Sequence, residues 1–177
     1  MYLTELFTRP VQYEFTKDKP DSVRASFVIE DLVYRVYMDL DPDAAAVFEL
    51  GGPTETFSDM WDITFSVSSL DSHGGYGEED TITDTGNAIA VFSTVIDIVQ
   101  ETVAHHNIQN LYFTAHEPSR IKLYNRMAKQ FTKNGWRYID NREIEARSSG
   151  DFKSDINSFI LTKQPHPHSQ MRGTKHD

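Results

Sequence analysis

Cysteine is absent from this sequence, and its absence removes a whole class of sites. A chain without thiols has neither disulfides nor thiolate metal ligands, so nothing points to an oxidising compartment. Long apolar runs are also missing, because no stretch approaches the length needed to span a bilayer. The first ten residues lack the basic start and apolar segment of a signal peptide. The sequence therefore predicts a cytoplasmic protein with no membrane segment.

Basic residues are also few compared with acidic ones. Lysine and arginine number 17 against 27 aspartates and glutamates, and the formal net charge is −10. A surface this acidic repels nucleic-acid backbones unless its basic residues gather in one patch. The basic residues do concentrate in the C-terminal half, where they suit either a solvated helix face or an anionic cofactor. We expect no nucleic-acid partner.

The first half of the chain is dominated by strand patterns. Polar and apolar residues alternate with a period of two from Val11 to Thr16 and from Trp61 to Ser69. The segment Ser22 to Leu40 is rich in Val, Tyr and Phe and predicts a hairpin with Glu30 and Asp31 at its turn. Weaker patterns indicate a short helix and one more strand: Leu3 to Phe7 and Ala46 to Leu50.

The second half alternates helices and strands. Apolar residues at helical spacing predict a helix from Asn87 to His106, which Asn107 ends. Proline favours the first turn of a helix, and Asn-Gly favours its end. The remaining predicted elements are a strand, a second helix and two last strands: Leu111 to Ala115, Pro118 to Asn134, Trp136 to Ile144 and Ser158 to Thr162.

This order predicts one domain of the α/β class over residues 1–163. Its 177 residues, 38% of them hydrophobic, suffice for one core. We expect a central mixed, mostly antiparallel sheet with two main helices. Residues 164–177 are polar and rich in proline and histidine, so we expect a C-terminal tail.

A glycine turn precedes the first of these helices, in the sequence T-D-T-G-N-A (Thr83 to Ala88). Glycine lets a phosphate approach the backbone, and the free N–H groups at a helix start attract anions. The alternative is an ordinary helix start capped by Asp84 or Thr85. The turn resembles the pyrophosphate-binding loop of the GNAT acetyltransferase superfamily. Gly86 and Ala88 fit that pattern, whereas Thr83 stands where the family has Arg or Gln.

The second helix begins with E-P-S-R-I-K-L-Y, which resembles the family pattern N-P-x-A-x-x-L-Y. Pro118, Leu123 and Tyr124 match it, whereas Glu117 and Arg120 depart from it. In many members of the family, the tyrosine at this position protonates the departing CoA thiolate. The alternative reading of Tyr124 is a core residue on the apolar stripe of the helix.

The resemblance implies a GNAT-like fold and an N-acetyltransferase that moves an acetyl group from acetyl-CoA to an amine. Tyr124 would be the general acid. The base stays open among Asp62, His116 and Glu117, because acetyl transfer needs a group that deprotonates the amine. The residues that the resemblance assigns to the cofactor pyrophosphate are Thr85, Gly86, Asn87 and Ala88.

A second function class remains open beside the enzyme. The degenerate motifs are compatible with a non-catalytic GNAT-fold scaffold, since a fold does not establish a function. The segment around Tyr124 also resembles GNAT-like proteins of tailed bacteriophages, which would place the protein in a host cytoplasm or a virion. The partner is then a neighbouring protein subunit, and for the enzyme it is a small-molecule or protein amine.

Histidines offer the only candidate metal ligands besides carboxylates. His105 and His106 are adjacent, and His166 and His168 flank a proline, but no third ligand has a suitable spacing in the sequence. The acidic run from Asp39 to Asp43 lacks the glycine and terminal glutamate of a calcium loop. The sequence therefore predicts no metal site.

Overall fold

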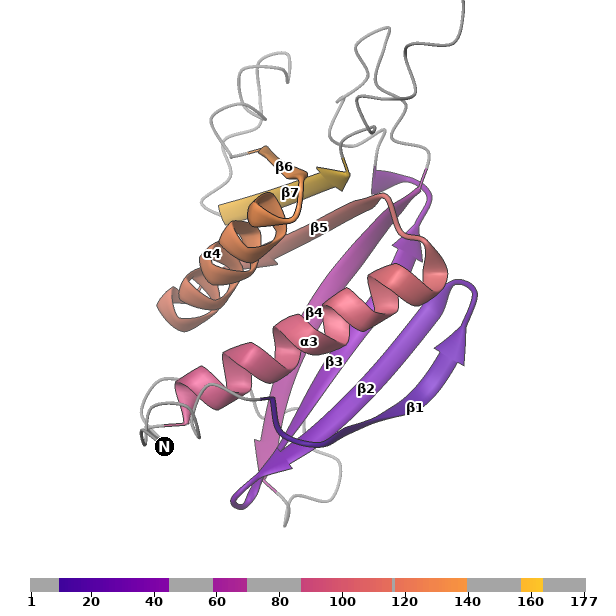
Figure 1. Cartoon of the computed structure of the whole chain (residues 1–177). Helices are drawn as coiled ribbons and strands as arrows, with labels where there is room; N and C mark the ends of the chain where they lie inside the picture. Colours follow the sequence, from indigo (N-terminus) through magenta and orange to yellow (C-terminus); the bar gives the residue numbers. More distant parts are fainter. Residues whose placement is uncertain (1–9, 45–58, 70–86, 116, 140–156, 164–177) are drawn as a thin grey trace, which may run out of the picture.

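The computed structural model describes residues 10–44, 59–69, 87–115, 117–139 and 157–163. These residues form one seven-stranded sheet in the order β1-β2-β3-β4-β5-β7-β6, and two helices cover one of its faces (Figure 1). The elements are β1 (Tyr13–Lys19), β2 (Ser22–Ile29), β3 (Leu32–Asp41), β4 (Met60–Ser69), α3 (Ala88–His106), β5 (Asn110–Ala115), α4 (Pro118–Lys133), β6 (Trp136–Ile139) and β7 (Asn157–Lys163).

The first four strands form an antiparallel meander, as their period-two patterns predict. The β2–β3 hairpin turns at Glu30 and Asp31, and Glu30 adopts a left-handed backbone with φ 54°. The strand predicted to start at Val11 begins instead at Tyr13 and continues to Lys19. A register shift interrupts its pairing with β2 between Phe15 and Lys17, and this local bulge bends the edge strand.

The second half contributes two crossovers. Helix α3 joins β4 to β5, which are parallel neighbours. Helix α4 joins β5 to β6, and β7 lies between these two strands, antiparallel to both. The sheet is therefore mixed, with one parallel pair among antiparallel ones. This confirms the predicted α/β class and the two main helices, and the finer GNAT assignment remains a proposal.

The helices end where their sequences indicate. Asn107 ends α3 in a left-handed conformation, with φ 50° and ψ 44°, and its N–H bonds the carbonyl of Val103. Pro118 opens α4, where its missing N–H costs no helical hydrogen bond. Gly135, with φ 88°, turns the chain from α4 into β6.

One main core lies between the helices and the sheet. Alternate residues of the strands enter it, so Trp61, Ile63, Phe65 and Val67 of β4 are all buried on the helix face. Helix α3 has the length and apolar composition of a membrane span, contrary to the expectation that no stretch does, but it packs on the sheet. Within the described residues there is thus no clear membrane segment.

Several predictions concern residues outside the described ones. They are the helix Leu3 to Phe7, the strand Ala46 to Leu50, the end of the strand beyond residue 139 and the tail 164–177.

Candidate functional site

Strands β4 and β5 are joined over a short length only. Their pairing begins at Met60 and Asn110 and ends at Asp62 and Tyr112, after which no ladder between them follows in the described residues. Both strands continue, however, β4 to Ser69 and β5 to Ala115. Figure 1 shows them separating toward the side on which α3 and α4 begin. We call these diverging segments, 63–69 and 113–115, the strand fork.

The fork leaves main-chain groups without a partner strand. From Ile63 onward, the edge of β4 that faces β5 has no ladder within the described residues, while its other edge stays paired with β3. Unpaired strand edges present N–H and C=O groups that a ligand in extended conformation can bond. Besides the outer edges of β1 and β6, the fork is thus a place where the described sheet presents an edge without a partner strand.

Asp62 lies at the vertex of the fork. Its side chain projects from the sheet face opposite the helices, on which Asp39 is its direct neighbour in β3. Burial first, and then the charges of Asp41 and Asp39, raise the pKa of Asp62 to about 6, against a smaller lowering by hydrogen bonds from Thr64 and Ile63. A carboxyl group with this pKa changes its charge near neutral pH, which suits a general base.

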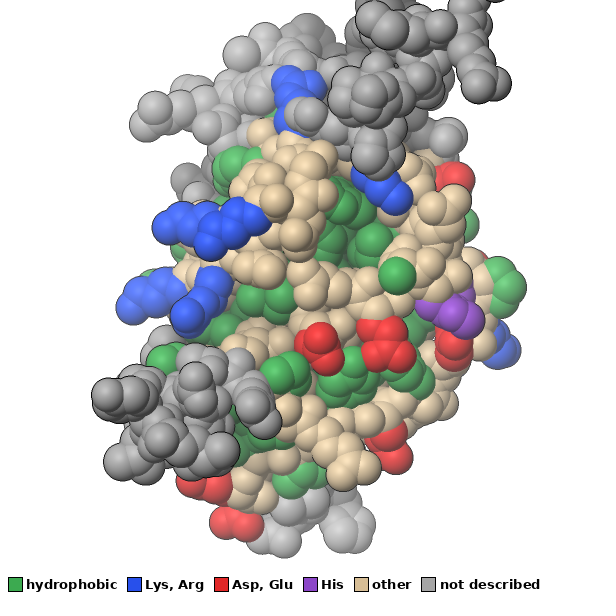
Figure 2. All heavy atoms as spheres, in the orientation of Figure 1, with side chains coloured by type: hydrophobic (Ala, Val, Ile, Leu, Met, Phe, Trp, Pro, Cys, Tyr) green, Lys and Arg blue, Asp and Glu red, His purple; other side chains and the backbone are tan. Residues whose placement is uncertain are grey.

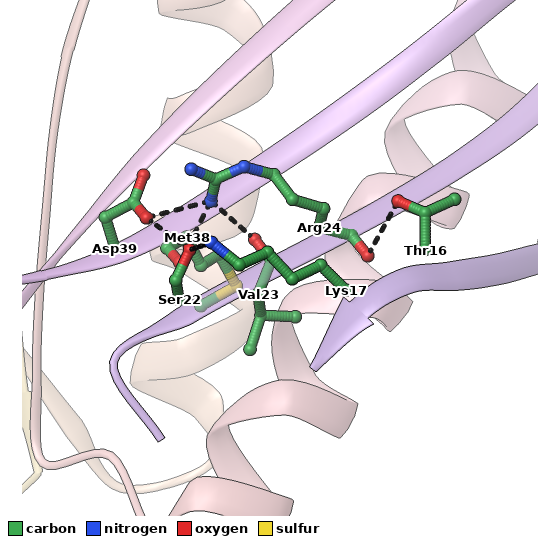
Figure 3. A network of polar contacts seen from close by, with 7 residues as sticks. All are labelled: Thr16, Lys17, Ser22, Val23, Arg24, Met38 and Asp39. Carbon is green, nitrogen blue, oxygen red and sulfur yellow. Dashed lines mark hydrogen bonds and ion pairs between the residues drawn. The ribbon is translucent and has the colours of Figure 1, made fainter. Parts of the chain in front are cut away.

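The two acidic neighbours of Asp62 have donors of their own. Arg24 pairs with Asp39 at 2.9 Å, and the Ser22 hydroxyl donates to the same carboxylate oxygen at 2.8 Å (Figure 3). The Tyr112 hydroxyl donates to Asp41 Oδ2 at 2.8 Å. Asp39 and Asp41 are thus hydrogen-bonded on the same face of the sheet as Asp62, on which their charges act.

Tyr124 projects from α4 into the main core. It is 1% exposed, and its ring lies 4.5 Å from that of Phe113 and 6.0 Å from that of Phe159. No residue in the described part of the chain forms a hydrogen bond with its hydroxyl. Burial raises the pKa of Tyr124 to about 12, so the hydroxyl stays protonated and is a donor. A buried donor costs free energy unless it is hydrogen-bonded, so a ligand, a water or a residue outside the described part of the chain would complete this one.

The charges around Tyr124 connect it to the vertex. Arg120 lowers its pKa, whereas the charges of Asp62 and Glu117 raise it. Arg120 and Glu117 form an ion pair at 3.5 Å within the first turn of α4. Of the three candidate bases, Asp62 has a raised pKa, and its charge raises the pKa of Tyr124. Glu117 forms an ion pair with Arg120. His116 lies outside the described residues.

The start of α3 contains the described part of the predicted phosphate loop. Asn87 is the N-cap and Ala88 the first helical residue, so the alternative caps Asp84 and Thr85 were wrong. The Asn87 side chain makes no capping hydrogen bond, and the first turn contains no acidic residue. The first N–H groups of the helix are thus left without an intrahelical partner at its positive end. Thr85 and Gly86 lie outside the described residues.

The two helices differ sharply in charge. Helix α4 carries only basic charged residues, whereas the acidic residues Asp97 and Glu101 lie on α3. Figure 2 shows Lys and Arg side chains gathered over α4 and acidic side chains over α3. An anionic ligand near the helix starts would therefore be attracted to the α4 side. The basic residues of α4 are Arg120, Lys122, Arg126, Lys129 and Lys133.

Two cavities lie away from the fork. One of about 370 Å³ lies between the C-terminal ends of α3 and α4, and its lining includes Asn107, Phe131 and Lys163. The other, of about 140 Å³, lies beside His105 and His106. Neither of these two cavities is lined by Asp62 or Tyr124.

No protein-family model matches the chain, and no curated protein matches it in sequence. The site therefore rests on geometry and chemistry. Sequence reasoning placed Tyr124 on the correct helix and Asp62 among the candidate bases. It missed Tyr112 and Asp41, because their hydrogen bond joins strands that lie 71 residues apart in the chain.

Proposed function

We propose that this protein is an acetyl-CoA-dependent N-acetyltransferase with a GNAT-like fold. The observation that carries the proposal is the strand fork, with a titratable group on each face of the sheet beside it. Asp62, with a pKa near 6, lies at the vertex on the face opposite the helices, and Tyr124 lies on the helix face, with its ring 4.5 Å from that of Phe113 in β5. Groups whose environments separate their pKa values in this way are typical of an acid and a base that work together.

In acetyl transfer, Asp62 acts as the general base and Tyr124 as the general acid. The carboxylate of Asp62 accepts a proton from the acceptor ammonium, directly or through a water, which frees the nitrogen lone pair. The neutral amine attacks the thioester carbonyl carbon, a C–N bond forms and the C–S bond breaks. The Tyr124 hydroxyl donates its proton to the departing thiolate, and the proton that the amide nitrogen still has to lose returns through water to the tyrosinate. Main-chain N–H groups on the edge of β4 that has no partner strand among the described residues would stabilise the negative charge that develops on the carbonyl oxygen.

The cofactor would enter from the side on which α3 begins. The backbone from Thr85 to Ala88, at the positive end of α3, would hold the pyrophosphate of acetyl-CoA. The basic residues of α4 favour the remaining phosphate charge. The unpaired edge of β4 would bond the extended part of the cofactor.

The acceptor is inferred from charge. Asp39, Asp41 and Asp62 lie on the sheet face opposite the helices, next to the vertex. Three carboxyl groups attract a cation and repel an anion. A polyamine, a lysine side chain or an aminoglycoside therefore fits this face better than an acidic amine does.

The test is acceptor-dependent release of the CoA thiol by the purified chain. Spermidine, lysine and an aminoglycoside are offered with acetyl-CoA, and the expected result is turnover with at least one cation. Asp62→Asn should lower kcat by about 100-fold, the usual contribution of a general base. Asp31→Asn, the same change in the exposed β2–β3 turn, should leave kcat unchanged. Absence of thiol release with every acceptor would contradict the proposal.

The deep burial of Tyr124 favours a second candidate, a non-catalytic GNAT-fold scaffold. In that case Tyr124 is a core residue, and the protein acts as a bacteriophage virion or host-interaction protein through neighbouring subunits. The two candidates differ in cofactor binding, because a scaffold has no reason to bind acetyl-CoA.

A further inference from the structure

Two adjacent histidines and one aspartate meet where the end of α3 lies against the edge strand β1. The Nε2 atom of His106 lies 2.6 Å from Asp18 Oδ1, and the Nε2 atom of His105 lies 3.4 Å from Asp18 Oδ2. One donor atom from each of the three residues lies within 4.8 Å of the others. Both imidazoles therefore point their Nε2 atoms at the same carboxylate.

The three donors match the chemistry of a transition metal. Imidazole nitrogen and carboxylate oxygen bind zinc at about 2.0–2.2 Å, and tetrahedral coordination then separates donor atoms by about 3.3 Å. The distance from His105 Nε2 to Asp18 Oδ2, 3.4 Å, is already close to this separation. The shorter distance, from His106 Nε2 to Asp18 Oδ1, has to increase by roughly 0.7 Å. A small rotation of the Asp18 side chain, which is 44% exposed, is enough for this.

The surrounding structure orients these ligands. The ring of His106 is 12% exposed and packs 5.5 Å from the ring of Trp61. Asp18 follows the bulge of β1, which changes the direction of the strand before it reaches the helix. His105 and His106 follow each other at the helix end, and their rings pack edge to face at 5.0 Å. His106 is therefore positioned by packing, whereas His105 and Asp18 are more exposed.

The space beside the cluster suits a cation that keeps an open position. A cavity of about 140 Å³ is lined by all three residues and by Glu101. Asp18 and Glu101 bring two carboxyl groups to this cavity. Three protein ligands leave a tetrahedral ion one position, which water or a small anion fills. The cavity provides the room for that ligand.

We propose that Asp18, His105 and His106 form a binding site for a zinc-class divalent metal, which ties β1 to the end of α3. This inference is independent of acetyl transfer. The sequence does not indicate the third ligand, because Asp18 lies 88 residues before His106 and only the packing of β1 on α3 brings them together. Spacing within the sequence found two ligands and could not find the third.

The test is calorimetric titration of the metal-free full chain with zinc chloride. We expect one zinc per chain at the site and a loss of affinity of at least 10-fold in both His105→Gln and Asp18→Asn. These side chains are 67% and 44% exposed, so the two variants should fold. A double variant, His166→Gln with His168→Gln, is the control for the tail and should keep the site.

A second readout separates metal binding from a general effect of the substitutions. Zinc should raise the thermal midpoint of the wild-type chain and leave that of His105→Gln unchanged, because only a ligand of the folded state stabilises it. Zinc affinity that survives in both single variants would overturn the proposal. So would a wild-type chain that binds no zinc, or one whose binding is lost in the tail variant alone.

Discussion

Asp62 on β4 and Tyr112 on β5 are the last residues that pair these two parallel strands. Their position has two consequences. Beyond them the strands diverge, and among the described residues no strand pairs with the edge of β4 that faces β5. At the same point Asp62 is partly withdrawn from water and faces Asp39 and Asp41, which together raise its pKa to about 6. Main-chain hydrogen-bond donors and the carboxyl group of Asp62, with its raised pKa, thus lie at the same end of the β4–β5 pairing.

The raised pKa of Asp62 predicts a stability effect that depends on pH. The carboxyl group of Asp62 has an ordinary pKa of 3.8 in the unfolded chain and about 6 in the fold. The folded state therefore binds the proton more tightly, and the stability it gains is lost as the pH rises from about 4 to 6. Asn cannot ionise, so Asp62→Asn should gain stability relative to wild type between pH 4 and pH 8.

We expect this relative gain to be about 1–2 kcal/mol, after allowance for the exposed part of the side chain. Urea denaturation of both proteins at pH 4 and pH 8 measures it. Asp31→Asn in the exposed turn is the matched control and should show no such difference. An equal stability difference at both pH values would show that the pKa of Asp62 is not raised.

The same group predicts the pH dependence of the proposed activity. If Asp62 is the base, kcat should rise with pH through a midpoint near 6, since only the ionised carboxyl accepts a proton. The Asp62→Asn variant should lack that midpoint. A wild-type profile that is flat between pH 5 and pH 7 would remove Asp62 from the mechanism.

Tyr124→Phe should separate catalysis from stability. The hydroxyl has no partner among the described residues, so its loss should leave the free energy of unfolding unchanged or raise it by up to about 1 kcal/mol. The rate of acetyl transfer should nevertheless fall by about 100-fold, because the general acid is gone. Urea denaturation and thiol release measure the two effects. A loss of more than about 2 kcal/mol would mean that the hydroxyl has a structural partner instead.

Tyr13 joins the edge strand to α3 and should contribute measurably to stability. Its hydroxyl contacts Asp97 Oδ2 at 2.9 Å and also Glu101 Oε2, two acids one helical turn apart. Tyr13→Phe removes both hydrogen bonds and leaves the like charges facing each other, at a cost of about 1–2 kcal/mol. Tyr37→Phe is the control, since its ring still packs under Arg24. Equal urea midpoints for Tyr13→Phe and wild type would contradict this account.

Asn107 predicts a backbone effect at the end of α3. Its left-handed conformation costs a residue with a Cβ roughly 1–2 kcal/mol, and glycine does not pay this cost. Asn107→Gly should therefore be at least about 1 kcal/mol more stable than Asn107→Ala in thermal or urea denaturation. Equal stability of the two variants would argue against the left-handed helix end.

Local signals in the sequence predicted the elements well, and long-range contacts account for what it missed. The turn at Glu30, the stop at Asn107 and the start at Pro118 follow from backbone preferences of single residues, which act wherever the chain goes. The strand fork does not follow from such local preferences. Periodicity predicts which side of β4 is buried, but it does not predict where the pairing of β4 with β5 ends. That divergence depends on how both helices pack.

In the candidate site too, local sequence signals predicted some features, and others depend on long-range contacts. Tyr124 was found from a helix motif, and Asp62 was one of three possible bases. What distinguishes Asp62 is its neighbours Asp39 and Asp41 on β3, which the hairpin and the meander bring beside it. A carboxyl group's pKa depends on burial and on nearby charge, and both arise only from the tertiary structure.

The central claim is that the start of α3 and the strand fork bind acetyl-CoA, and calorimetric titration of the purified chain with acetyl-CoA tests it most directly. We predict micromolar binding that Gly86→Glu abolishes, because the added carboxylate would face the pyrophosphate. Gln130→Glu, which adds the same charge at an exposed position near the other end of α4, should keep the affinity. No detectable binding at millimolar acetyl-CoA would contradict the account and favour the scaffold.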